Sequence, residues 1–221
     1  MRLGIIIPAF NAGSRLHSVL TGVKKYTKNI VVINDGSTDN TQKIALNDKV
    51  PVLSHLQNLG KGGALKSGFA YALNAKWELV ITLDADGQHD PSFIPYFIDA
   101  YRITNDAIII GSRMTSLESM PFHRILSNKI TSGLVGLLSG IRVLDSQSGY
   151  RLIHSDVLKT IKLHTSRYET ETEILIKSGL KGFRCSAINI STIYNGEPSS
   201  MHLVKDTLRF IKLYFKCLYE Y

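Results

Sequence analysis

Cysteine is scarce in this chain: Cys185 and Cys217 are its only two thiols in 221 residues. Two thiols can form one disulfide at most, which excludes the disulfide-rich scaffolds of small secreted domains. The apolar run at residues 3–8 is too short for the core of a secretion signal and predicts a first strand instead. We therefore expect a reducing, cytoplasmic setting.

Long apolar runs are missing as well. No stretch reaches the roughly 18 apolar residues that a membrane-spanning helix requires. The nearest, residues 125–141, is interrupted by Asn128, Lys129 and several serines and glycines. Low-complexity tracts and internal repeats are absent, and a hydrophobic content of 44% is ordinary for a globular protein. We expect one globular domain that can lie on a membrane without crossing it.

Acidic residues are outnumbered, above all in the second half. Residues 111–221 carry 15 basic and 9 acidic side chains, against 11 and 9 in residues 1–110. The whole chain has a net charge of +8. A basic half is typical of proteins that bind nucleic acid, phosphate groups or an anionic membrane face, and also of a merely solvated basic surface.

The first half of the chain alternates short β-branched runs with segments of helical spacing, which predicts a parallel sheet with helices on both faces. The expected strands are residues 3–8, 30–34, 52–55, 79–83 and 107–111, and the expected helices are 14–26, 38–46, 63–74 and 92–101. The second half predicts helices at 122–138, 169–179 and 204–219, a strand at 183–193 and a polar turn at 145–151.

Polar loops follow three of these strands directly, at residues 8–11, 34–37 and 84–88. In open α/β sheets, ligands bind beyond the carboxyl ends of the strands. The topology alone therefore predicts that these loops form a binding site.

The third loop contains Asp84 and Asp86, which are separated by one small residue. In an extended segment, residues i and i+2 point the same way, so both carboxylates are expected to face one point. Hard oxygen ligands suit Mg²⁺ or Mn²⁺, and Gln88 can add a neutral oxygen. An aspartate-rich turn without a metal is the alternative.

Two further features point to a nucleotide. Asp35 follows a strand and can accept hydrogen bonds from a base or a ribose, whereas Asp39 is placed to cap the next helix. Residues 58–63 form a glycine-rich turn whose backbone N–H groups can approach phosphate, and Lys61 adds a positive charge there. The full Walker pattern is missing, which disfavours a nucleoside triphosphatase.

Together these motifs resemble those of the family 2 glycosyltransferases, and most of all the dolichol-phosphate mannosyltransferases and polyprenyl-phosphate glycosyltransferases. The matching stretches are residues 5–11, 32–39, 58–62, 83–91, 111–113, 145–151 and 168–173. The resemblance implies an α/β protein of GT-A fold, with a Rossmann-like, mostly parallel central sheet flanked by helices. It implies a catalytic domain over residues 1–200 and a C-terminal amphipathic helix over 201–221.

The resemblance also implies a role for each matching residue. The substrate-binding positions are Pro8, Phe10, Asn11, Asp35, Lys61, Asp84, Gln88, Arg151 and Ser199. The catalytic positions are Asp86, Asp145, Glu171 and Arg113, and Asp84, Asp86 and Gln88 would hold Mg²⁺ or Mn²⁺. Many relatives carry an acidic residue where this chain has Ala12, so the resemblance assigns no nucleotide contact to that position.

The expected reaction is transfer from a GDP- or UDP-sugar with inversion at the anomeric carbon, as the family resemblance implies. A sugar hydroxyl as acceptor would need a general base such as Asp145 or Glu171, whereas a lipid phosphate is already anionic and needs cations for positioning. The basic second half, with Arg113, Arg124, Lys129 and the final basic helix, favours a polyprenyl-phosphate acceptor over a sugar hydroxyl. No nucleic-acid partner is expected. The alternatives are transfer to a sugar hydroxyl, a non-catalytic nucleotide-sugar binding protein and a nucleotidyltransferase.

The last predicted helix is strongly amphipathic. Its basic stripe consists of Lys205, Arg209, Lys212 and Lys216, and the adjacent apolar face consists of Val204, Leu208, Ile211, Phe215 and Leu218. Such a helix can lie in a membrane interface with its cations near lipid phosphates, or it can dock on the protein's own core. We therefore expect a cytoplasmic protein, associated with the cytoplasmic face of a membrane in the first case.

Overall fold

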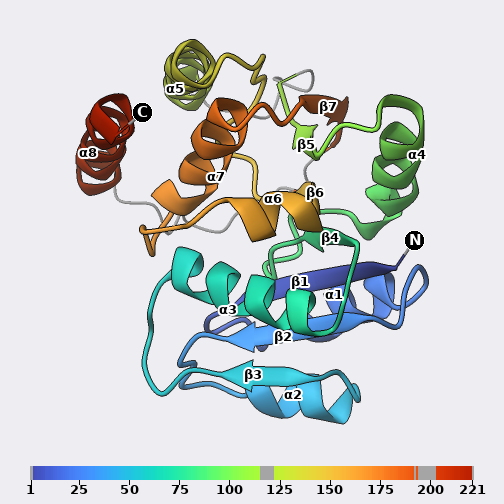
Figure 1. Ribbon diagram of the computed structural model, residues 1–221. Coiled ribbons are helices and arrows are strands. Elements are labelled where there is room, and N and C mark those ends of the chain that lie inside the picture. The colour runs from blue at the N-terminus through green and yellow to red at the C-terminus, as the bar shows by residue number, and fades with distance from the viewer. Residues whose placement is uncertain (1, 115–121, 192, 194–202, 221) are drawn as a thin grey trace.

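The computed structural model of the protein describes residues 2–114, 122–191, 193 and 203–220. These residues form a seven-stranded sheet in the order β3-β2-β1-β4-β6-β5-β7, with helices on both faces (Figure 1). The strands are β1 Leu3–Ala9, β2 Ile30–Asn34, β3 Val52–Ser54, β4 Leu79–Thr82, β5 Ile108–Ser112, β6 Arg151–His154 and β7 Cys185–Asn189. The predicted mostly parallel α/β architecture is confirmed.

Helices cover the sheet in two layers. The described helices are α1 Leu16–Val23, α2 Thr41–Asn47, α3 Lys61–Asn74, α4 Ile94–Thr104, α5 Phe122–Ser139, α6 Ser155–Thr160, α7 Glu169–Leu180 and α8 Leu203–Glu220, with a 3₁₀ turn at Pro91–Phe93. Helices α1, α2 and α4 share one apolar core, and α3, α5, α6, α7 and α8 share the other.

The central strands are buried on both faces, which explains their continuous apolar runs. In β1, Ile5 and Ile7 belong to the core beneath α1, whereas Ile6 belongs to the core beneath α3. Alternate side chains of a strand point to opposite faces, so a strand covered on both sides has no polar face. The ends of β1 to β5 predicted from the sequence differ from the observed ends by at most one residue.

Strand β6 was not predicted. It lies antiparallel between β4 and β5, where Val80 is paired with Ile153 and Ile109 with Leu152. The strand is short and begins with Arg151, so the sequence offers no β-branched run of the usual length. The residues before it were expected to be a polar turn, and they do form the approach to this strand.

Within the described ranges, no helix has the length and apolar character needed to cross a bilayer. Helix α8 packs against α7, on the side of the sheet that also carries α5 (Figure 1).

Candidate functional site

The loops after β1, β2 and β4 meet at one edge of the sheet. Ala9 is paired with Asn34 at the ends of β1 and β2, and Ile6 is paired with Thr82 at the end of β4. Asn11, in a left-handed conformation (φ 49°), accepts the backbone N–H of Thr38 at 2.9 Å. The predicted convergence of polar loops is therefore present.

The N-terminal loop also carries the residues expected to contact a nucleoside. Pro8 lies at the end of β1 and is partly buried, and the side chain of Phe10 is 51% exposed at the same edge. Ala12 is fixed by its backbone N–H, which donates to Thr41 Oγ1 at 2.8 Å. Asp39 accepts the Thr41 N–H at 3.0 Å, but it lies one position before the N-cap of α2, which is Asn40 and not Asp39 as expected.

Asp35, in the loop after β2, is hydrogen-bonded to the glycine-rich turn at residues 58–63. Its carboxylate accepts the N–H groups of Leu59 and Gly60 at 2.9 and 2.8 Å and lies 2.7 Å from His55 Nδ1. The other ring nitrogen of His55 is 2.8 Å from Ser67 Oγ. Asp35 thus holds the backbone that precedes Lys61, while its expected contact with a nucleoside stays a prediction. His55 was missed because its role depends on a partner in a different loop, far from it in the sequence.

Lys61 lies between two carboxylates. Its Nζ is 2.7 Å from Asp84 Oδ1 and 3.1 Å from Glu171 Oε1, so α3, the β4 loop and α7 meet at one ion cluster. Burial disfavours the ammonium, but the charges of Asp84 and Glu171 outweigh burial and raise the pKa of Lys61 above its usual value. The sequence marked all three residues, yet gave no sign that they form one cluster.

Asp84 and Asp86 are not equivalent. Strand β4 ends at Thr82, and Asp86 lies in a turn completed by Gly87 (φ +74°). The expectation that the two aspartates share an extended segment is therefore wrong. Asp84 faces Lys61, whereas the Asp86 carboxylate accepts the N–H of Gln88 at 2.9 Å.

The electrostatics of the two aspartates differ accordingly. Burial opposes ionisation of Asp84, but the surrounding cations, Lys61 first, outweigh it and lower the pKa of that carboxyl. For Asp86, burial and then the charge of Asp84 raise the pKa. Burial and the charge of Asp84 thus disfavour the ionised form of Asp86 more than the Gln88 N–H, Lys61 and Arg15 favour it.

These residues fit a divalent cation. In the part of the chain that the structure describes, no three His, Cys, Asp or Glu side chains are already arranged as a metal site. However, a bound cation would favour the ionised form of Asp86, whose pKa the neighbouring Asp84 helps to raise, and oxygen ligands suit Mg²⁺ and Mn²⁺. Gln88 lies next to this turn, and its backbone C=O accepts the N–H of Ile193 at 3.0 Å.

His89 supports the same loop from beneath. Its Nδ1 lies 3.2 Å from the backbone N of Asp84, which donates to it, and its ring stacks at a tilt on Tyr150, with the centroids 5.1 Å apart. Burial is the main cause that lowers the pKa of His89 to about 4. The imidazole is therefore neutral near pH 7 and acts as an acceptor that fixes the loop.

Asp145 forms a bidentate ion pair with Arg113. The guanidinium donates from Nε to Oδ2 at 2.9 Å and from a terminal nitrogen to Oδ1 at 3.0 Å, and Asn128 on α5 donates to Oδ1 at 2.6 Å. Burial opposes ionisation of Asp145, but Arg113 outweighs it and lowers the pKa. A carboxylate with both oxygens engaged and a lowered pKa is a poor general base.

Arg151 is a buried side chain that is bonded to the backbone around the ion cluster. The residue is 1% exposed and donates to three backbone carbonyls, those of Ser146, Ser148 and Glu171. The structure shows Arg151 bound to the protein's own backbone, so the substrate contact that the family resemblance implied for it stays a prediction. Ser199, the last of the predicted substrate-binding residues, lies outside the described residues.

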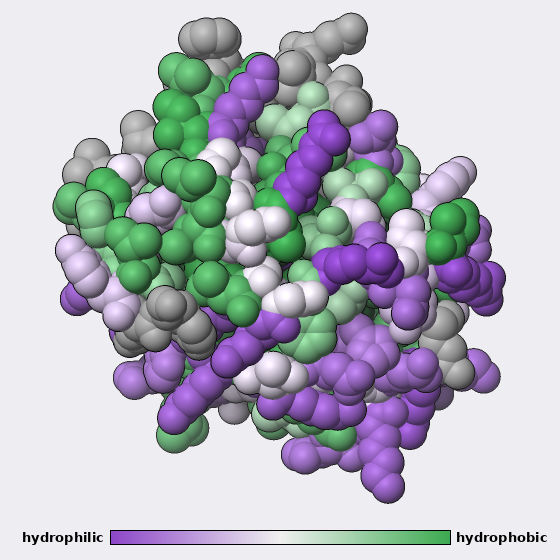
Figure 2. All heavy atoms as spheres, turned by 45° about the horizontal axis from the view of Figure 1, so that its top comes forward, coloured by the Kyte–Doolittle hydropathy of each residue, from purple (hydrophilic) through white to green (hydrophobic). Residues whose placement is uncertain are grey.

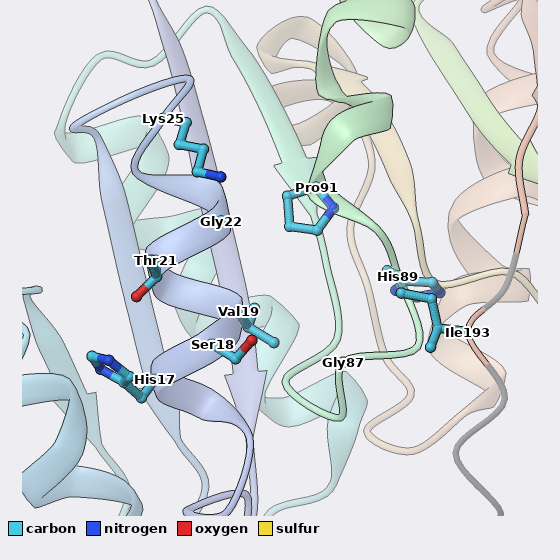
Figure 3. Close-up of a pocket in the computed structure, with 10 residues that line it drawn as sticks. All are labelled: His17, Ser18, Val19, Thr21, Gly22, Lys25, Gly87, His89, Pro91 and Ile193. Atoms are coloured by element: carbon cyan, nitrogen blue, oxygen red, sulfur yellow. The ribbon is translucent and has the colours of Figure 1, made fainter.

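A cavity of about 470 Å³ lies beside the turn that carries Asp86, between α1 and residues 87–91 (Figure 3). Its lining includes Lys25, Gly87, His89 and Ile193, but neither Asp84 nor Asp86. The ion cluster of Lys61, Asp84 and Glu171 is therefore separate from this cavity.

Gly149 leaves room for the cluster. A Cβ atom there would lie 2.6 Å from Lys61 Nζ and 2.8 Å from Glu171 Oε1. We expect Gly149→Ala to push Lys61 aside and to lower kcat/KM about tenfold or more, because displacements of about 1 Å can cost this much. Steady-state transfer assays would measure the effect.

Gly133→Ala on α5 is a matched control, because a Cβ at that position would meet nothing within 4 Å. Alanine also favours a helix over glycine, so this variant should keep its activity and its melting temperature. Full activity in Gly149→Ala would contradict the tight fit around Lys61.

The sheet and its strand-end carboxylates define a glycosyltransferase of GT-A fold. The chain belongs to glycosyl transferase family 2, because the model of that family matches residues 4–162. It is therefore an enzyme, a hexosyltransferase, and the family resemblance seen in the motifs is confirmed.

Individual proteins agree with this assignment. The UDP-N-acetylglucosamine–dolichyl-phosphate N-acetylglucosaminyltransferase of Methanococcus voltae is 32% identical over 86% of this chain and 85% of its own length. The dolichyl-phosphate beta-glucosyltransferase of Saccharomyces cerevisiae is 30% identical over 95% of this chain and 72% of its own. Glucosyl-3-phosphoglycerate synthase of Mycobacterium tuberculosis, 18% identical, has a similar fold, with a TM-score of 0.73 over 98% of this chain and 79% of its own.

Proposed function

We propose that this enzyme transfers a sugar from a UDP- or GDP-sugar to a polyprenyl or dolichyl phosphate, with Mg²⁺ or Mn²⁺ as cofactor. One observation carries the choice of acceptor. Asp145 and Glu171, the two carboxylates that could deprotonate a sugar hydroxyl, are paired with Arg113 and Lys61. With these two carboxylates held in ion pairs, an acceptor that is already anionic and needs no base is favoured.

The relatives support the same acceptor class. The enzymes from Methanococcus voltae and Saccharomyces cerevisiae are both named for dolichyl phosphate, but one transfers N-acetylglucosamine and the other glucose. Agreement on the acceptor and difference in the sugar support a lipid phosphate here, and they leave the sugar to experiment. The structurally similar synthase was crystallised with Mn²⁺ and UDP-glucose, which supports a divalent cation and a nucleotide-sugar donor.

The residues that would hold the cation are Asp84, Asp86 and Gln88. A divalent ion bound there would supply positive charge where negative charge develops on the leaving diphosphate. Lys61 keeps Asp84 ionised and adds a cation of its own, and Asp86, whose ionised form a bound cation would favour, is the principal ligand in this proposal.

In the proposed reaction an oxygen of the acceptor phosphate attacks the anomeric carbon, and the bond from that carbon to the nucleoside diphosphate breaks. A phosphate monoester has a second pKa of about 6 and is largely dianionic near neutral pH, so no proton has to be removed. Arg113, held in orientation by Asp145, can present its positive charge to an incoming phosphate.

Purified enzyme mixed with donor, Mn²⁺ and a short-chain, water-soluble polyprenyl phosphate tests this proposal. We expect nucleoside diphosphate release and a sugar-linked lipid phosphate. The matched control is the corresponding polyprenol, which has the same chain and a hydroxyl in place of the phosphate and should accept no sugar. Equal transfer to the polyprenol, or transfer only to sugar hydroxyls, would refute the proposed acceptor.

Polyprenyl phosphates reside in bilayers, so this proposal places the enzyme at the cytoplasmic face of a membrane, with no role for nucleic acid. A catalytic domain over residues 1–200, followed by α8 as a separate amphipathic element, is part of the same proposal. The contact of α8 with α7 supports a fixed position of this helix against the domain.

A further inference from the structure

Helix α8 is apolar on two opposite faces. Its inner face consists of Leu213 and Cys217, both buried in the core that α7 shares, with Phe210 partly buried beside them. Successive residues of a helix turn by about 100°, so Ile211 and Phe215 lie on the side away from Leu213. The apolar face recognised in the sequence is therefore not the face that docks on the protein.

The outer face of α8 remains exposed among the described residues. Its apolar side chains are Leu208, Ile211, Phe215, Leu218 and Tyr219, each at least 43% exposed. Lys212 and Lys216 are exposed along one border of this face. The side chains of Val204 and Lys205, which the sequence placed on the same helix faces, lie outside the described residues.

Helix α5 continues the apolar surface and also reaches the reaction centre. Leu126, Ile130 and Leu137 recur at helical spacing on one side of α5 and are exposed. On another side, Asn128 is bonded to Asp145, and Ser132 is bonded to Ser146 Oγ at 3.1 Å. Both α5 and α8 pack against α7, and Figure 2 shows apolar residues gathered over the side of the molecule where α5 and α8 lie.

We propose that the outer face of α8 and the exposed stripe of α5 form a docking surface for an anionic lipid bilayer. The inference rests on the proposed function and adds the surface by which the enzyme reaches its lipid acceptor. Exposed apolar side chains would enter the boundary of the acyl chains, and Lys212 and Lys216 would lie near lipid phosphates.

Charge favours a bilayer over a second copy of the chain as the occupant of this surface. A symmetric contact through the same face would bring two basic borders into one interface, where like charges repel. An anionic bilayer instead complements the lysines, and the connection through Asn128 would keep Asp145 and Arg113 close to the membrane that carries the acceptor.

Co-sedimentation of the full-length protein with vesicles tests the surface. We expect binding to vesicles that contain phosphatidylglycerol, and much weaker binding to pure phosphatidylcholine in about 0.1 M salt, where surface charges still act over about 10 Å. The double variant Ile211→Glu with Phe215→Glu should lose at least about tenfold in vesicle affinity, because it places two charges in the apolar contact.

A second variant and a control separate the contributions. Lys212→Glu with Lys216→Glu should remove the preference for anionic vesicles. Leu56→Glu is the matched control, because Leu56 is fully exposed in the loop after β3, away from this surface, and its variant should bind vesicles as the unchanged protein does. Circular dichroism checks that each variant is folded.

Activity distinguishes a failure of the docking surface from a failure of the proposed function. The variant at Ile211 and Phe215 should keep transfer to a short, water-soluble polyprenyl phosphate and lose transfer to a long-chain acceptor embedded in vesicles. Wild-type protein that does not sediment with anionic vesicles would refute the surface, as would a stable dimer that this variant dissociates. Vesicle binding without any transfer to the short acceptor would refute only the proposed function.

Discussion

Replacing Asp86 with asparagine is expected to lower the rate of transfer by about 10²–10³-fold, the usual cost of removing a group that stabilises developing charge. It should also abolish the Mn²⁺-dependent stabilisation of the protein by a donor nucleotide sugar. Asp86 is the aspartate of this pair whose pKa is raised, because burial and then the charge of Asp84 oppose its ionisation, and a bound cation would favour the ionised form. Transfer kinetics and thermal unfolding with and without Mn²⁺ would measure both effects.

The same variant should not be less stable without ligands. An acid whose pKa is raised on folding binds its proton more tightly in the native state, so its ionised form costs stability once the pH rises above its ordinary pKa of 3.8. The neutral amide of Asp86→Asn avoids that cost, and its melting temperature near pH 7 should be equal or higher. A variant that loses activity through unfolding would contradict this account.

Asp99→Asn is a suitable control for the loss of one negative charge. Asp99 lies on α4, is exposed, and forms an ion pair with Arg102 one turn further along the same helix. Because surface ion pairs contribute little, this variant should keep both its activity and its stability. Unchanged metal-dependent stabilisation in Asp86→Asn would show that the cation binds elsewhere.

Arg151→Met is expected to have the largest effect on stability. The substitution would leave three buried carbonyls, those of Ser146, Ser148 and Glu171, without their donor. An unpaired buried polar group costs about 1–3 kcal/mol, so we expect the free energy of unfolding to fall by roughly 3 kcal/mol or more. Natural domains have only about 5–15 kcal/mol in total, and urea unfolding would detect the change easily.

Arg102→Met provides the comparison for Arg151. Arg102 is exposed on α4 and makes one ion pair, with Asp99, so its substitution should change the unfolding free energy by less than about 0.5 kcal/mol. If Arg151→Met were equally mild, the three carbonyls would have to find other donors, and the hydrogen bonds of Arg151 would not stabilise the fold.

Much of the fold could be predicted because each of these parallel strands is marked by a local pattern of apolar residues. Continuous apolar runs marked β1, β2 and β4, and the polar loops that follow them marked the edge where the site lies. Strand β6 could not be predicted in the same way. It is short, it begins with a buried arginine, and it is stabilised by β4 and β5, which both lie far before it in the sequence.

The residues of the ion cluster could be picked out from sequence motifs, but their arrangement in space could not. Lys61, Asp84 and Glu171 each belong to a recognisable motif, whereas their assembly into one ion cluster depends on tertiary contacts between three elements. The turn at Asp86 shows the same limit, because the assumption of an extended segment came from the preceding strand alone.

Helix α8 illustrates a third case. Its amphipathic pattern was plain in the sequence. However, the helix has two opposite apolar faces, and only one of them can pack on the protein's own core. Leu213 and Cys217 fit the core beside α7, and that choice leaves Phe215 outward. Periodicity identifies the faces of a helix, and only the surrounding surface decides which of them is buried.

The position of β6 determines when the sheet can be completed during synthesis of the chain. Strands β4 and β5 are separated by β6, so the sheet stays in two parts until residues 151–154 have been synthesised and inserted between them. Pairing between segments so far apart in the chain slows folding. Because Glu171 lies still further along, a nascent chain emerging from the ribosome has no reaction centre until α7 has followed, and the enzyme gains its activity only with its last core elements.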